Sequence, residues 1–145
     1  MLTPAEIAVA NFSQHYNCSQ SVFSAFAEQF GLNRETALKL ASPFGGGVAR
    51  RGEICGAVTG ALLALGLARG ADKPAGKDEI YRLSQEFMRL FEQKHPSLLC
   101  RDLIATDIST LAGYQAATEK RVFTTICPLL VQDAAEIAQK LLEAA

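Results

Sequence analysis

The chain has 145 residues, of which 49% are apolar and 20% are charged, and its net charge is −1. This length suits one domain over residues 1–145 with a core of its own, and the composition excludes a disordered chain. A near-neutral charge and the lack of tryptophan argue against a nucleic-acid-binding surface, which needs a basic face and stacking aromatic side chains.

Capping residues predict three helices in the first 41 residues. A Thr-x-x-Glu capping box followed by a proline predicts the first helix over residues 4–15. Asn17 and Asn33 are good N-caps for two further helices, over residues 18–30 and 34–41. The sequence leaves open whether the first two are one kinked helix.

A glycine-rich loop precedes a buried helix. Gly45–Gly47 cannot form a stable helix, and they let the backbone approach a ligand or another chain closely. Arg50 and Arg51 follow, and we interpret them as solvated loop residues, with binding of an anion or a partner as the alternative. The helix is expected over residues 53–68, where small residues spaced four apart leave one smooth face for a close neighbour.

The second half of the chain contains a clearly amphipathic helix. Apolar residues at helical spacing predict it over residues 77–94, and a His-Pro pair ends it. A short helix is expected from about residue 98 to residue 105, and the last runs from Pro128 to about residue 143. Residues 106–126 fit either a loop or a broken helix. The predicted fold is an all-α, single-domain bundle of about six or seven helices.

The first residues of the chain and its apolar segments predict a cytoplasmic protein that does not insert into a membrane. The first residues carry neither the basic nor the apolar segment of a secretory signal. Residues 54–68 are the longest run without a charge, and they fall short of the ~20 residues that cross a bilayer. A reducing compartment disfavours permanent disulfides, so the cysteines point instead to metal or redox chemistry.

Four cysteines are the candidate functional residues: Cys18, Cys55, Cys100 and Cys127. None lies in a C-x-x-C pair, which excludes a zinc ribbon, a thioredoxin motif and a c-type haem site. Each falls at or near the predicted start of a helix, where free amides and the helix dipole favour a thiolate. A low thiol pKa suits both metal ligation and thiol exchange. To act together, the four must be brought from four separate helices.

The residues around the second cysteine are similar to a known family. Residues 55–60 read Cys-Gly-Ala-Val-Thr-Gly, with one cysteine upstream and two downstream, the last followed by Pro128. This order and spacing resembles the C-GCAxxG-C-C family of redox-active proteins over nearly the whole chain. The resemblance implies a redox role for the four cysteines, with an iron–sulfur or other metal centre on them.

Three chemistries and one inert interpretation stay open. Four thiolates can hold a [2Fe–2S] cluster, which makes the chain an electron carrier or redox accessory with another redox protein as partner; homodimer formation also stays open. They can hold zinc, although structural zinc sites usually draw ligands from two close pairs. Without a metal the chain would be a thiol/disulfide oxidoreductase, with Cys55 as the first candidate for the attacking thiol. The inert interpretation is a helical interaction domain with structural cysteines and no cofactor.

Overall fold

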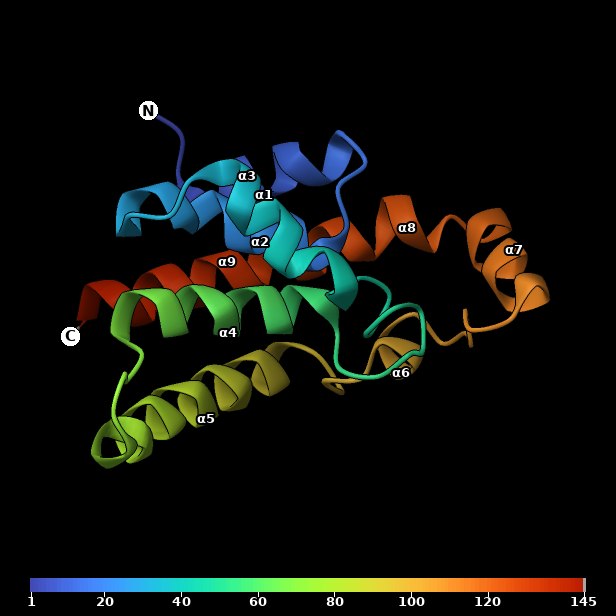
Figure 1. Ribbon diagram of the computed structural model, residues 1–145. Helices are drawn as coiled ribbons and strands as arrows, with labels where there is room; N and C mark the ends of the chain where they lie inside the picture. Colours follow the sequence, from blue (N-terminus) through green and yellow to red (C-terminus); the bar gives the residue numbers. More distant parts are fainter. Residues whose placement is uncertain (145) are drawn as a thin grey trace.

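The computed structural model describes residues 1–144, which form an all-α structure (Figure 1). The longer helices are α1 (Pro4–Ser13), α2 (Cys18–Ala27), α3 (Arg34–Ala41), α4 (Gly56–Arg69), α5 (Lys77–Lys94), α7 (Leu111–Glu119) and α9 (Cys127–Ala144). Two short α-helices and three 3-10 turns complete the described part: α6 (Cys100–Leu103), α8 (Val122–Thr125), η1 (Glu28–Phe30), η2 (Ser42–Phe44) and η3 (Pro74–Gly76). The prediction of an all-α bundle is confirmed.

The structure of residues 1–144 also bears on β-structure and on membrane-spanning helices. Residues 1–144 contain no named β-strand, and the β-type contact found there is an isolated antiparallel bridge between Ile54 and Leu99. None of their helices combines the length and the apolar character needed to cross a membrane. The single-domain boundary at residues 1–145 and the cytoplasmic location stay predictions.

The predicted caps set the starts of the first helices. Thr3 and Glu6 form the capping box of α1, and Asn17 forms a second capping box with Gln20 at the start of α2. Residues 4–30 are therefore two helices and a final 3-10 turn rather than one kinked helix. The chain turns between the two helices at His15, whose φ of +74° is left-handed.

The buried helix α4 is the centre of the bundle, and it packs against α2, α5 and α9. The backbone of α2 crosses it so closely that a Cβ atom at Gly60 would lie 2.6 Å from the carbonyl oxygen of Ser19. Large side chains fill the core on the other sides, among them Phe26, Phe87 and Phe91. The smooth face expected on this helix is thus the face that receives α2.

A second, smaller core forms beside one end of the bundle. We call residues 100–126 the lobe; they hold α6, α7 and α8, and α7 lies farthest from the bundle (Figure 1). The buried side chains of this core are Cys100, Ile104, Ile108, Ala117, Val122 and Cys127. The stretch left undecided by the sequence, 106–126, is thus mostly helical, with a break at Arg121, whose φ is +60°. Phe12, Cys18 and Ile126 pack against both cores, so the two cores meet there.

One nearly buried hydrogen bond joins the end of α5 to α9. The Nε2 atom of His95 lies 2.8 Å from a carboxylate oxygen of Asp133, and both side chains are nearly buried. The His95 ring also packs on Phe91, with 4.8 Å between ring centroids. The pair helps to hold α9, and with it Cys127, against the bundle.

Two glycine substitutions in α4 test the close crossing. Gly60→Ala should lower the free energy of unfolding by about 1–3 kcal/mol, as overpacking of a tight core does, because the new Cβ would meet the backbone of Ser19. Gly66→Ala is the matched control, since nothing lies within 4 Å of a Cβ there, and it should raise stability by up to ~1 kcal/mol through helix propensity. Urea unfolding measures both, and equal shifts in the two variants would contradict the packing described.

Candidate functional site

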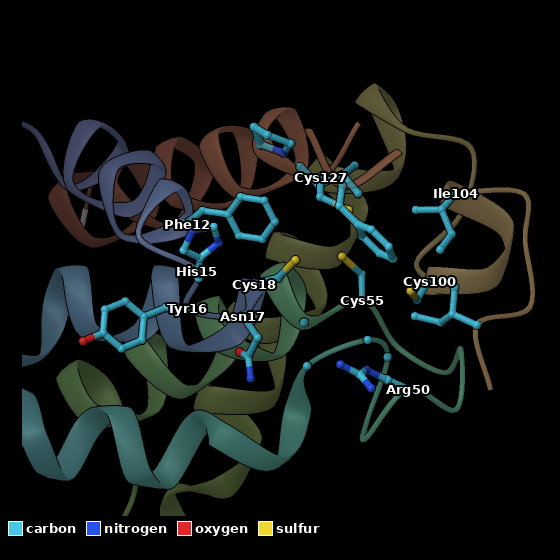
Figure 2. Close-up of a pocket in the computed structure, with 18 of the residues that line it drawn as sticks. Phe12, His15, Tyr16, Asn17, Cys18, Arg50, Cys55, Cys100, Ile104 and Cys127 are labelled. Atoms are coloured by element: carbon cyan, nitrogen blue, oxygen red, sulfur yellow. The ribbon is translucent and has the colours of Figure 1, made fainter. Parts of the chain in front are cut away.

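All four cysteines line one cavity of about 890 Å³ at the junction of the two cores. Cys55 belongs to the core of the bundle, whereas Cys100 and Cys127 belong to the core of the lobe; Cys18 packs against both. Figure 2 shows their side chains reaching toward a common space from separate elements. All four are free thiols. The structure thus brings together residues that lie far apart in the sequence.

Each cysteine lies at the start of a helix, as the sequence predicts. Cys18, Cys100 and Cys127 are the first residues of α2, α6 and α9, and Cys55 is the N-cap of α4. Two details differ from the prediction. α4 begins after Cys55 instead of at residue 53, and α9 begins one residue earlier than expected because the Ile126 carbonyl already accepts the first helical hydrogen bonds.

A short backbone pairing sets Cys55 beside Cys100. The N–H of Cys55 donates to the carbonyl of Leu98 at 2.8 Å, and the N–H of Cys100 donates to the carbonyl of Glu53 at 2.7 Å. These bonds flank the bridge between Ile54 and Leu99. The pairing keeps residues 53–55 extended, which explains why the helix cannot begin at Glu53, and it holds the two thiols at neighbouring positions.

The glycine loop packs directly on the cysteines. A Cβ atom at Gly47 would lie 2.7 Å from the Cβ of Cys100, and one at Gly45 would lie 2.6 Å from the side-chain nitrogen of Asn17. Only residues without a side chain allow the loop to come this close. The loop therefore forms one wall of the cavity, next to Cys18 and Cys100.

The same loop contains an unusual left-handed turn. Residues 46–50 all have positive φ, between +50° and +69°, and three of them are not glycine: Val48, Ala49 and Arg50. Each such residue costs roughly 1–2 kcal/mol relative to a right-handed conformation. The turn carries Arg50 to the lobe, where its guanidinium carbon lies 4.4 Å from the ring centre of Tyr114. Sequence patterns alone gave no sign of this conformation, because the three residues are ordinary ones.

Aromatic and basic side chains complete the lining of the cavity. Phe12, Tyr16, Tyr114 and Phe123 line it, and the last two rings pack together with centroids 5.3 Å apart. His15 and Arg50 also line it, while no Asp or Glu does so in the described part of the chain. The sequence did not single out these aromatic residues, since only the fold places them near the cysteines.

Burial is the main influence on the pKa values of Cys55 and Cys100. Burial raises the pKa of Cys55 to about 11 and the pKa of Cys100 to about 12. The pKa of Cys18 is raised well above its usual range, first because its thiol donates a hydrogen bond to Cys127 and then because it is buried. The same hydrogen bond lowers the pKa of Cys127. The expectation of a low pKa at all four helix starts is therefore wrong for three: for Cys55 and Cys100 lost hydration outweighs the helix ends, and for Cys18 the hydrogen bond to Cys127 acts first.

Four free thiols gathered in one helical cavity are an arrangement suited to thiol- or metal-based redox chemistry. A family model described as "Putative redox-active protein (C_GCAxxG_C_C)" matches residues 16–141. The chain belongs to this family, which confirms the resemblance of the motif at residues 55–60. No curated protein and no solved structure gives a significant match to the chain.

Alkylation of the native, metal-free protein should follow the order of the thiol pKa values. The thiolate is the reactive form, so a thiol with a lowered pKa reacts at lower pH and one with a raised pKa needs alkaline solution. We expect iodoacetamide at about pH 8 to modify Cys127 before Cys55 and Cys100, as measured by peptide mass spectrometry. Unfolded protein, in which all thiols react alike, is the control. Fastest reaction at Cys55 would contradict this order.

Proposed function

We propose that Cys18, Cys55, Cys100 and Cys127 together hold an iron–sulfur centre, in the simplest case [2Fe–2S], and that the chain acts as an electron carrier or redox accessory. The observation that carries this proposal is that all four cysteines line one cavity from the starts of four helices. Family membership supports redox activity and leaves the cofactor open. The chemistry such a centre supplies when bound is one-electron transfer.

The arrangement of the thiols favours a core with more than one metal. Cys18 packs against the core that contains Cys127, and Cys55 and Cys100 are joined through their backbones, so thiols from separate helices lie close together. A [2Fe–2S] cluster takes four Cys ligands, two on each iron. Among residues 1–144, no three His, Cys, Asp or Glu side chains are placed to hold a single metal ion. Structural zinc sites usually draw their sulfur ligands from two close pairs in the sequence, and these four cysteines form no such pairs.

The glycine loop supplies donors that suit a sulfur-rich anionic group. Gly46 and Gly47 line the cavity, and within the described residues their N–H groups donate to no backbone carbonyl and no side chain. Gly47 is buried, and buried amides without an acceptor are rare in folded proteins. Hydrogen bonds from such amides to sulfur ligands stabilise their negative charge and tune the potential of a centre. These orphan amides fit the proposed group.

The raised thiol pKa values have a direct consequence for loading. Metal ligation requires deprotonated thiols, so binding releases protons and is opposed by whatever raises the pKa of Cys18, Cys55 and Cys100. Cys127 is the thiol most readily deprotonated, because Cys18 donates to it. We infer that it is the first ligand to bind. The expected partner remains another redox protein, and homodimer formation stays open.

Anaerobic purification without chelators tests the proposal. We expect visible absorption with about two iron atoms and labile sulfide per chain. Replacing each cysteine in turn by serine should remove most of the iron, while circular dichroism shows that the helices remain. Because Ser19 directly follows Cys18 and is not a ligand, Ser19→Ala is a control that should keep the iron. Colourless protein, or protein with one zinc per chain, would contradict an iron–sulfur centre.

A pair of glycine substitutions separates the effect of the contact between the glycine loop and Cys100 from the effect of backbone strain. Gly47→Ala places a Cβ 2.7 Å from the Cβ of Cys100, so it should displace this ligand and lower iron content several-fold. Gly31→Ala is the matched control: its φ of +88° is also left-handed, but nothing lies within 4 Å of the added Cβ. It should lower stability and keep the iron per folded chain. Equal iron content in both variants would contradict the role given to the loop.

The contact between Cys18 and Cys127 favours a second candidate, a metal-free thiol/disulfide oxidoreductase. Its attacking thiol would be Cys127, and Cys18 would resolve the mixed disulfide. The sequence nominates Cys55 for the attack, and that role stays a prediction, although burial and a raised pKa weigh against it. Oxidised glutathione added to metal-free protein distinguishes the pairs: a mapped Cys18–Cys127 disulfide supports this order, and a disulfide through Cys55 supports the other.

A further inference from the structure

The cavity is far larger than the thiols and a small inorganic core require. Its volume of about 890 Å³ corresponds to roughly thirty water molecules at ~30 Å³ each. Pockets that bury an organic ligand have volumes of about 300–1,000 Å³. A core of a few atoms on the four cysteines leaves most of this space free. The residues that line the rest of the cavity therefore indicate which class of ligand it can bind.

Aromatic residues line much of the wall away from the thiols, together with aliphatic side chains such as Ile104 and Leu130. Phe12 and Tyr16 come from the end of α1 and the turn before α2, whereas Tyr114 and Phe123 come from the lobe. Figure 2 shows the Tyr16 ring directed away from the cysteines, and the Arg34 guanidinium carbon lies 5.5 Å from its centre. The bundle thus contributes the Phe12 ring, and the two rings of the lobe pack at an angle of 34° to each other. Aromatic faces of this kind hold planar ring systems by stacking and edge contacts. The lining favours a flat aromatic ligand over an aliphatic one.

The charged part of the lining is basic. Arg50 reaches the rim of the cavity and rests on the Tyr114 ring, and the imidazole of His15 lies elsewhere on the wall (Figure 2). No carboxylate of the described residues pairs with Arg50, and none lines the cavity. A guanidinium held against a ring and left without a carboxylate is a ready partner for an anionic group.

Backbone strain in the loop also indicates a ligand-binding site near Arg50. Val48, Ala49 and Arg50 are held in the left-handed region by hydrogen bonds within the loop, including that from the Arg50 N–H to the Gly45 carbonyl at 3.0 Å. Strained backbone of this kind concentrates where ligands are bound. In this strained turn Arg50 lines the cavity and rests on the Tyr114 ring of the lobe.

We propose that this cavity binds a planar aromatic anion, with its ring against the aromatic walls and its acidic group at Arg50. The inference deepens the proposed function, because it names the class of small molecule that reaches the thiols, and it rests on that function for the ligand's role beside the redox site. Binding itself depends only on the cavity. A small inorganic anion would use the charge of Arg50 and leave the aromatic walls unused.

Anthraquinone-2-sulfonate is a suitable probe, because it is planar and anionic and its quinone ring has no free position for thiol addition. Calorimetric titration of anaerobically purified protein should show saturable binding of one probe per chain. Arg50→Gln should weaken binding at least tenfold, and Arg50→Lys should weaken it less. Arg51→Gln is the matched control, since Arg51 follows in the same loop and does not line the cavity; it should change the affinity less than twofold. Uncharged 2-(hydroxymethyl)anthraquinone should bind at least tenfold more weakly, and sulfate should not compete.

Three results would overturn the inference: no saturable binding to the native protein, equal losses in Arg50→Gln and Arg51→Gln, or displacement of the probe by sulfate. Circular dichroism of each variant separates loss of the site from loss of the fold. Iron analysis of the same samples keeps the two proposals apart. Metal-free protein that binds the probe would support the ligand site and contradict the iron–sulfur centre. Iron-loaded protein that does not bind the probe would support the iron–sulfur centre and contradict the ligand site.

Discussion

The close contact between the backbones of α2 and α4 is the constraint on which the site depends. At Gly60 the two helices approach until no Cβ atom fits between them, and at Gly56 a Cβ atom would lie only 3.1 Å from the Cβ of Cys18. This contact brings the start of α2, with Cys18, against the start of α4, with Cys55. The extended residues before α4 then pair with the chain before α6 and bring in Cys100. Three of the four thiols thus follow from one helix crossing and one short backbone pairing.

The site also joins two parts of the molecule, the bundle and the lobe. The bundle has a large core of its own, whereas the lobe has a small one whose buried side chains include two of the cysteines. A group bound through thiols of both cores would link them, and its binding free energy would add to the stability of the lobe. The cation–π contact of Arg50 with Tyr114 is a second link across the same cavity. Occupancy of the site and order of the lobe are therefore expected to be coupled.

Local sequence signals predicted much of the fold, because they act within a few residues. Asn17 and Asn33 predicted their helices through short-range caps, and strong amphipathic periodicity predicted α5. Residues 106–126 could not be read because their helices are short and are divided by a left-handed Arg121. Motif order singled out the four cysteines, but their convergence depends on the crossing of α2 and α4.

Other features of the site could not be predicted because they depend on tertiary surroundings. The left-handed Val48–Arg50 turn involves residues with no preference for that conformation, and contacts with the rest of the loop impose it. The thiol pKa values depend on burial, which outweighs the helix position that the sequence shows.

The central claim is that four thiols from the two cores hold one polynuclear centre. The most direct measurement is X-ray absorption at the iron edge on anaerobically purified protein. The account predicts that every iron has only sulfur neighbours and that a second iron lies close by, since four cysteines and bridging sulfide supply all the ligands. Iron with nitrogen or oxygen neighbours, an isolated iron, or protein without iron would contradict it.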